Sequence, residues 1–179
     1  AYDRGSLKAK LCVEGNKMMG DLAKELDFHF IRCGKVLVGN TEEDMETLKR
    51  TMEQGKDNGA TNLELIDEKR LHELVPAVVG KFAMFSHNSG IVDPFGYTIA
   101  LAENAHANGV EYHFGCEVTA IRREDDDTYE ITTTKGNFKT RWVVNCAGLG
   151  CGKISDMLGI TGYRIIGSKG DYIILDKRT

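Results

Sequence analysis

Residues 142–158 read WVVNCAGLGCGKISDML, and this stretch decides the class of fold. Its first five residues, 142–146, are mostly apolar and uninterrupted, a pattern typical of a buried parallel strand. Small residues and glycines follow at 147–152, and a helical pattern begins at Lys153. A strand, a glycine turn and a helix in this order, together with the antiparallel strands expected elsewhere, predict a mixed α/β (α+β) fold.

The glycine turn after this strand is a candidate ligand site. The carboxyl edge of a parallel strand, next to the start of a helix, presents backbone N–H groups that favour an anion. Gly148, Gly150 and Gly152 would let a phosphate or a sugar chain approach closely. The alternative is a plain strand-to-helix turn in which glycine supplies a positive φ. The chain contains no complete Gly-x-Gly-x-x-Gly dinucleotide fingerprint.

Capping signals predict three long helices upstream of this stretch. Apolar residues at helical spacing indicate a helix over Ser6–Leu26. Thr41, followed by acidic residues, begins a second helix that should stop near Gly59. Asp93-Pro94 begins a third, which should run to about Asn108-Gly109.

The expected strands share apolar or β-branched residues and are bounded by turn residues. They comprise 28–39 with a turn at Gly34, 63–66 before a brief helix capped by Asp67, 80–92 with a turn at 88–90 and a return strand, 111–114, an antiparallel meander of 117–123, 129–134 and 137–141, and a closing segment at 164–176.

Composition excludes several classes of function. The 179 residues carry a formal net charge of −4, so nothing predicts a nucleic-acid partner. No apolar run approaches the roughly 20 residues of a transmembrane helix. The five cysteines form no Cys-x-x-Cys pair, so we expect free thiols, no metal and a cytoplasmic protein, with peripheral membrane association as a second option. The chain enters abruptly at Ala1 without a methionine, as an internal piece of a longer protein would.

Residues 143–159, VVNCAGLGCGKISDMLG, preceded by the meander that starts CEVTAIRRE at Cys116, resemble the D-amino-acid-oxidase-like superfamily of flavoproteins. Within it, the chain is similar to the branch of FAD-dependent glycerol-3-phosphate dehydrogenases and L-2-hydroxyglutarate oxidases. GSLKAK at 5–10, GIVDP at 90–94 and KGDY at 169–172 are also similar to that branch.

The resemblance implies two partial domains. Residues 1–27 and 93–160 would belong to a Rossmann-like FAD-binding domain that carries the meander. Residues 28–92 and 161–179 would belong to a mixed-sheet substrate-binding domain. The glycine fingerprint and the C-terminal portion of the family are absent from this sequence. We therefore predict that this chain alone neither retains FAD nor is active, because the missing first strand and its loop hold most of the cofactor.

The resemblance also implies the residues that contact FAD. Val118 should lie where the family's backbone touches the adenine. The turn formed by Asn145, Cys146, Ala147 and Gly148, continued by Gly150, should lie against the phosphate or ribityl portion.

Members of the branch oxidise a secondary alcohol: a hydride passes to the flavin while a base removes the hydroxyl proton. The implied partners are a small anionic hydroxy substrate and an electron acceptor, which could be oxygen, a quinone or a protein. His87 is the best-placed base, with a plain surface-turn histidine as the alternative. Arg164 and Lys169 could hold the anion, or be ordinary exposed charges.

Three functional hypotheses therefore stay open. The first is a fragment of an FAD-dependent glycerol-3-phosphate dehydrogenase. The second is a fragment of an L-2-hydroxyglutarate or other 2-hydroxyacid oxidase. The third is an α/β binding module without a cofactor, which should expose no apolar patch where a first βαβ unit would pack.

Overall fold

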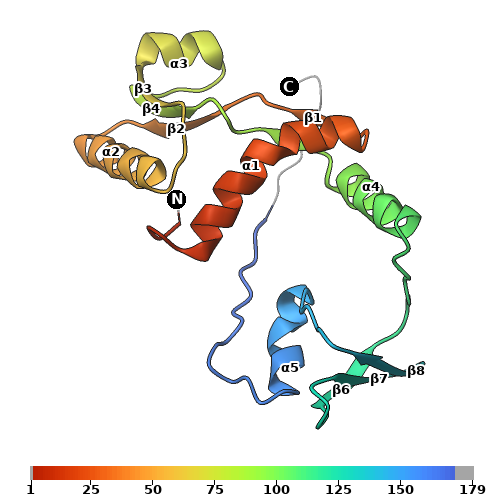
Figure 1. Cartoon of the computed structure of the whole chain (residues 1–179). Coiled ribbons are helices and arrows are strands. Elements are labelled where there is room, and N and C mark those ends of the chain that lie inside the picture. The colour runs from red at the N-terminus through yellow and green to blue at the C-terminus, as the bar shows by residue number, and fades with distance from the viewer. Residues whose placement is uncertain (1, 172–179) are drawn as a thin grey trace. The chain divides into compact units, whose positions relative to one another are not determined.

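The computed structural model describes residues 2–171 of the chain. Two compact units are present, Ala1–Glu111 and Tyr112–Thr179, and each is described by itself. Unit 1 contains the elements α1 to α4 and β1 to β5, and unit 2 contains β6 to β8, the short 3-10 helix η1 and α5 (Figure 1). Helices and strands occur in both units, which confirms the predicted mixed α/β class.

The helices of unit 1 begin where the capping residues predict. Ser6 precedes α1 (Leu7–Glu25), and its Oγ accepts the N–H of Ala9 at 3.2 Å. Asp93 precedes α4 (Pro94–Ala107), and its carboxylate accepts the N–H of Phe95 at 3.0 Å. These side chains satisfy N–H groups that have no partner inside the helix.

The helix α2 (Glu42–Asp57) begins with a reciprocal capping box. Thr41 Oγ1 accepts the N–H of Asp44 at 3.1 Å, and the Asp44 carboxylate accepts the N–H of Thr41 at 2.9 Å. A further N–H, from Asn40 at 2.9 Å, is the largest reason why the pKa of Asp44 is lowered. Gly59 follows the helix with a φ of 87°, so the predicted stop is confirmed.

A three-stranded antiparallel sheet forms the centre of unit 1. Its order is β2 (Lys35–Gly39), β4 (Phe82–Ser86), β3 (Leu63–Asp67). The short helix α3 (Glu68–Leu74), capped by Asp67, follows β3. Leu71 of α3 is fully buried together with Ile66 and Ala83, and this cluster is the core of the unit.

The turn at 88–90 exists, but its return strand does not pair with β4. The return, β5 (Ile91–Val92), pairs instead with β1 (Phe30–Ile31). Both edges of β4 are already occupied by β2 and β3, so no backbone groups remain for a third partner. Gly34, with a φ of 77°, donates its N–H to Ser89 O at 2.9 Å and holds the turn beside the start of β2.

The predicted meander is confirmed in unit 2. It consists of β6 (Val118–Arg123), β7 (Tyr129–Thr133) and β8 (Gly136–Thr140), each antiparallel to the next. After an irregular segment, η1 (Gly148–Gly150) leads into α5 (Cys151–Asp156), so the predicted turn and short helix are also present.

Three predicted strands are wrong. Residues 142–146, 111–114 and 164–171 form no strand; residues 172–176 of the last prediction lie outside the described part of the chain. Within the described residues every strand pair is antiparallel, so the expected parallel strand is absent too. Trp142 and Val144 are 84 % and 82 % exposed. A β-strand needs a partner for its N–H and C=O groups, and no described strand pairs with residues 142–146.

A pH-dependent contribution to stability is expected at the first turn of the meander. Asp126 accepts hydrogen bonds from Lys139 Nζ at 2.8 Å and from Thr128, which lower its pKa to about 2, with Lys139 the largest cause. The pKa of Asp126 in the folded protein lies below the unfolded value of about 3.9. The stabilisation by its carboxylate is therefore fully present above about pH 3.9 and is lost as the pH falls from about 3.9 toward about 2.

Asp126→Asn should therefore lower the urea midpoint at pH 6 and leave it equal to that of the wild type near pH 2. Asp125→Asn is the control, because the Asp125 carboxylate accepts none of these hydrogen bonds. A deficit in Asp126→Asn that persists unchanged near pH 2 would contradict the assignment.

Candidate flavin and substrate site

Four of the residues predicted to contact FAD meet at one pocket of unit 2. The pocket has a volume of about 400 Å³ and is bounded by Val118, Asn145, Cys146 and Ala147 together with seven further residues. Those seven are mostly apolar: Ile121, Ile131, Thr140, Trp142, Val143, Val144 and Ile154. The meander supplies one wall and the segment after β8 supplies the other.

Asn145 folds the turn onto α5. Its Nδ2 donates to the carbonyl oxygen of Cys151 at 2.9 Å and to Ser155 Oγ at 3.3 Å. Its Oδ1 accepts the N–H of Ala147 at 3.3 Å. Ser155 is 8 % exposed, and its hydroxyl also hydrogen bonds to Tyr163 OH. The amide of Asn145 therefore sets the path of the turn without a strand.

The residues at this pocket suit part of a flavin nucleotide. Apolar walls fit an aromatic ring, and the backbone N–H of Cys146 has no hydrogen-bond partner among the described residues, so it is free to donate to a phosphate or hydroxyl oxygen. Gly148 and Gly150 lie in η1 and do not border the pocket. Gly148 has a φ of 55°, as the plain-turn alternative requires.

His87 lies at the end of β4 in unit 1 and pairs with a residue that the sequence analysis missed. Its Nε2 lies 3.0 Å from Glu64 Oε1, on the neighbouring strand β3. The imidazole also packs on Phe85, with ring centroids 4.2 Å apart. Glu64 lies on the same face of β3 as the buried Ile66 but is itself exposed, and only the strand register brings it to His87.

The turn that carries His87 is held by Asn88. The Asn88 side chain donates to Thr61 O at 3.2 Å and to Thr61 Oγ1 at 3.0 Å. Its backbone oxygen accepts from Asn16 at 3.0 Å and from Arg32 Nη1 at 2.6 Å. Three segments far apart in the sequence therefore fix the position of one turn.

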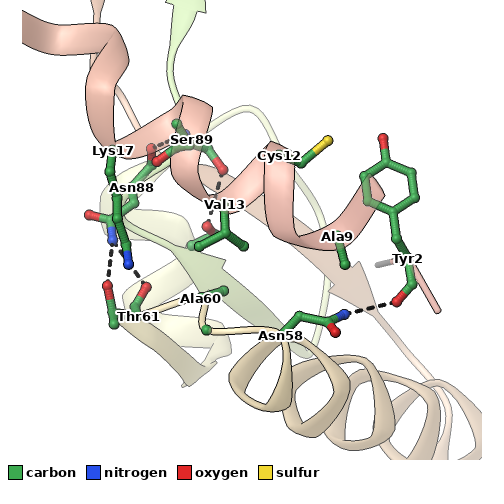
Figure 2. Close-up of a pocket in the computed structure, with 14 residues that line it drawn as sticks. Tyr2, Ala9, Cys12, Val13, Lys17, Asn58, Ala60, Thr61, Asn88 and Ser89 are labelled. Carbon is green, nitrogen blue, oxygen red and sulfur yellow. Dashed lines mark hydrogen bonds between the residues drawn. The ribbon is translucent and has the colours of Figure 1, made fainter. Parts of the chain in front are cut away.

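The other side of this turn borders a pocket of about 240 Å³ (Figure 2). Ser86, Asn88 and Ser89 contribute to it, whereas His87 does not. The remaining residues come from α1 and the segment before it, and from the end of α2 and the segment after it: Tyr2, Ala9, Cys12, Val13, Asn16, Lys17, Gly55, Asn58, Gly59, Ala60 and Thr61. Lys17 is the one charged residue among those that border it.

The two predicted anion-binding residues lie in unit 2 in a segment without regular structure. Lys169 pairs with Asp171 at 3.0 Å, and both side chains are more than 80 % exposed. Arg164 is exposed as well. His87 belongs to the other unit, unit 1.

The described residues contain neither a metal-binding cluster nor a membrane-spanning helix. Among residues 2–171 no group of three or more His, Cys, Asp or Glu side chains could hold a metal ion. The cysteines of the described chain are all free thiols. Within the same residues, no helix has the length and apolar character needed to cross a bilayer.

Comparison with known protein families gives a match along the whole chain. Residues 1–179 match the family described as DAO, FAD dependent oxidoreductase. The chain belongs to this FAD-dependent oxidoreductase family. The family predicted from the sequence resemblance is thus confirmed.

This DAO-family chain is similar in sequence to curated proteins with two different named activities. It is 38 % identical over 175 residues to a glycerol 3-phosphate dehydrogenase of Caloramator mitchellensis, covering 97 % of this chain and 36 % of that protein. It is 31 % identical to the mitochondrial L-2-hydroxyglutarate dehydrogenases of Nematostella vectensis and Homo sapiens, covering 97 % of this chain and 41 % and 40 % of those proteins. The chain therefore spans about two fifths of the length of these relatives.

Solved structures of related flavoenzymes share the fold. The L-proline dehydrogenase of P. horikoshii superposes with a TM-score of 0.78 at 25 % identity, over 88 % of this chain and 42 % of that one. An L-α-glycerophosphate oxidase from Mycoplasma pneumoniae with FAD bound also gives 0.78, at 22 % identity, over 88 % of this chain and 43 % of that one.

Proposed function

We propose that the native polypeptide containing this chain is an FAD-dependent dehydrogenase that oxidises glycerol 3-phosphate. The observation that carries the proposal is the 38 % identity, over 97 % of the chain, to a protein named glycerol 3-phosphate dehydrogenase. The L-2-hydroxyglutarate dehydrogenases match the same length of chain at 28–31 %. A short insertion or a single changed side chain can switch substrate at either level of identity, so the substrate needs a direct test.

The flavin, when bound, accepts the hydride that the alcohol carbon gives up. We assign Val118, Asn145, Cys146 and Ala147 to part of its binding site, because they border the same pocket. Asn145 holds the turn in place through α5, and the Cys146 N–H would be available to donate to an oxygen atom of the ligand. Gly148 and Gly150 keep the turn open behind them.

In this proposal, His87 is the base that removes the hydroxyl proton of the substrate. Nδ1 of its imidazole would accept the hydroxyl proton of the substrate, because Nε2 is taken up by Glu64. Arg164 and Lys169 are assigned to the phosphate of the substrate, because both are exposed cations of one segment. The two partial domains expected from the sequence, and a quinone or protein as electron acceptor, belong to the same proposal.

Anaerobic visible spectroscopy of the native polypeptide tests the substrate. We expect a flavin spectrum that bleaches on addition of glycerol 3-phosphate and stays oxidised with L-2-hydroxyglutarate at the same concentration. Bleaching by L-2-hydroxyglutarate alone would replace the proposal by the second candidate, which the several relatives with that name favour. A protein that takes up no FAD would overturn both.

A further inference from the structure

We propose that Glu64 is a positioning residue that fixes His87 for removal of the substrate's hydroxyl proton. This inference rests on the proposed role of His87 and adds a second residue to it. The inference is based on the contact between Glu64 Oε1 and His87 Nε2, which lie 3.0 Å apart.

The strand register brings these two side chains together. Glu64 of β3 lies opposite Phe85 of β4, and His87 follows two residues later, so all three side chains lie on one face. The backbone N–H of His87 donates to Asn62 O at 3.1 Å and extends the pairing of β3 with β4 by one step. His87 is therefore the diagonal neighbour of Glu64, a spacing that long side chains can bridge.

The imidazole is held from two directions. Phe85 packs against one side of the ring at 4.2 Å, and Glu64 binds Nε2 at its edge. Asn88, the next residue, is clamped to Thr61 and Arg32, so the backbone beneath His87 is fixed as well. Of the two ring nitrogens, Nδ1 is the one that Glu64 leaves available.

The carboxylate determines which nitrogen can act. An ionised Glu64 only accepts, so Nε2 must carry its hydrogen and Nδ1 must present its lone pair. When the substrate's O–H bond breaks, its proton forms an N–H bond at Nδ1 and the electron pair left on oxygen forms the C=O bond, while the hydride released from the carbon would be taken up by the bound flavin. The positive charge that develops on the ring then lies beside the Glu64 carboxylate, which stabilises it.

A purely structural ion pair does not explain the arrangement. The side chains of Glu64 and His87 are 47 % and 43 % exposed, and pairs so open to water contribute little to stability. Loss of Glu64 should therefore leave folding and flavin content unchanged. This separates a positioning role from a structural one.

The test measures the rate of flavin reduction by saturating substrate in the FAD-bound native polypeptide. Glu64→Ala should lower this rate about 10–100-fold, the usual effect of removing an orienting partner, with little change in KM. Glu64→Asp should recover part of the loss. Glu53→Ala is the matched control, because Glu53 is an exposed glutamate of α2 in the same unit and should leave the rate unchanged.

The background variant His87→Gln separates this inference from the proposed function. If Glu64 acts through His87, adding Glu64→Ala to the His87→Gln variant should not lower the rate of flavin reduction any further. The role of Glu64 would be overturned if the rate of flavin reduction falls strongly in His87→Gln but not in Glu64→Ala. It would also be overturned if the reduction in rate of the double variant is the product of the two single reductions. No loss in His87→Gln would overturn the role of His87 itself.

Nitrogen NMR of histidine-labelled protein gives a readout independent of activity. The wild type should show His87 with its hydrogen on Nε2, and Glu64→Ala should show a mixture of the two neutral tautomers. An unchanged tautomer in Glu64→Ala would count against the proposal even if the rate falls.

Discussion

Replacing His87 by glutamine is expected to lower the rate of flavin reduction by about 10²–10⁴-fold, the range for loss of a general base. Glutamine keeps a polar side chain that can still reach Glu64, but it cannot take up the hydroxyl proton. Because His87 is exposed and lies at the end of β4, the substitution should not disturb the core. The measurement is single-turnover reduction in the FAD-bound native polypeptide.

His72 supplies the matched control for this prediction. It lies on α3 in the same unit, is exposed, and shares no contact with the pair formed by Glu64 and His87. His72→Gln should therefore leave both the rate and the flavin spectrum unchanged. Equal rates in His72→Gln and His87→Gln would show that another group takes the proton.

Leu71→Ala is expected to destabilise unit 1 by about 2–5 kcal/mol, because it removes a buried side chain and leaves a cavity. Leu71 is fully buried between Ile66 and Ala83. A Cβ on Gly80 would lie 3.2 Å from Leu71 Cδ2 and 2.2 Å from Val38 Cγ1, which shows how closely the backbone approaches this cluster. The urea midpoint of the native polypeptide, or amide exchange in β3 and β4, measures the loss.

Leu37→Ala is the control for the core. Leu37 lies on the opposite face of the same sheet and is 41 % exposed, so it buries less apolar surface. We expect a clearly smaller loss than for Leu71→Ala. If the two losses are equal, the core of unit 1 does not lie where Ile66, Leu71 and Ala83 meet.

Much of the candidate flavin site could be predicted from the sequence, and the histidine pair could not. Val118 and the turn at 145–147 border one pocket, and their contact with FAD stays a prediction. Glu64 carries no signal of its own, because one glutamate in an alternating strand is an ordinary surface residue. It becomes a candidate only through the register of β3 with β4.

Local chemistry in the sequence was enough to predict the helices and the meander. Ser6, Thr41 and Asp93 begin helices because each side chain satisfies N–H groups within the next three residues. The turn at Asp126 joins β6 to β7 because the strands that it connects are neighbours in the chain. The interactions that stabilise these features form between residues only a few positions apart in the sequence.

Tertiary structure alone decided which strands pair in unit 1. The return strand β5 pairs with β1 because β4 is already paired on both edges, a fact set by residues more than 20 positions away. The apolar run at 142–146 has the composition of a buried strand, yet no described strand offers it a hydrogen-bonding partner. A strand is stabilised by groups on another segment, so its composition indicates a capacity to pair, and only the fold supplies the partner.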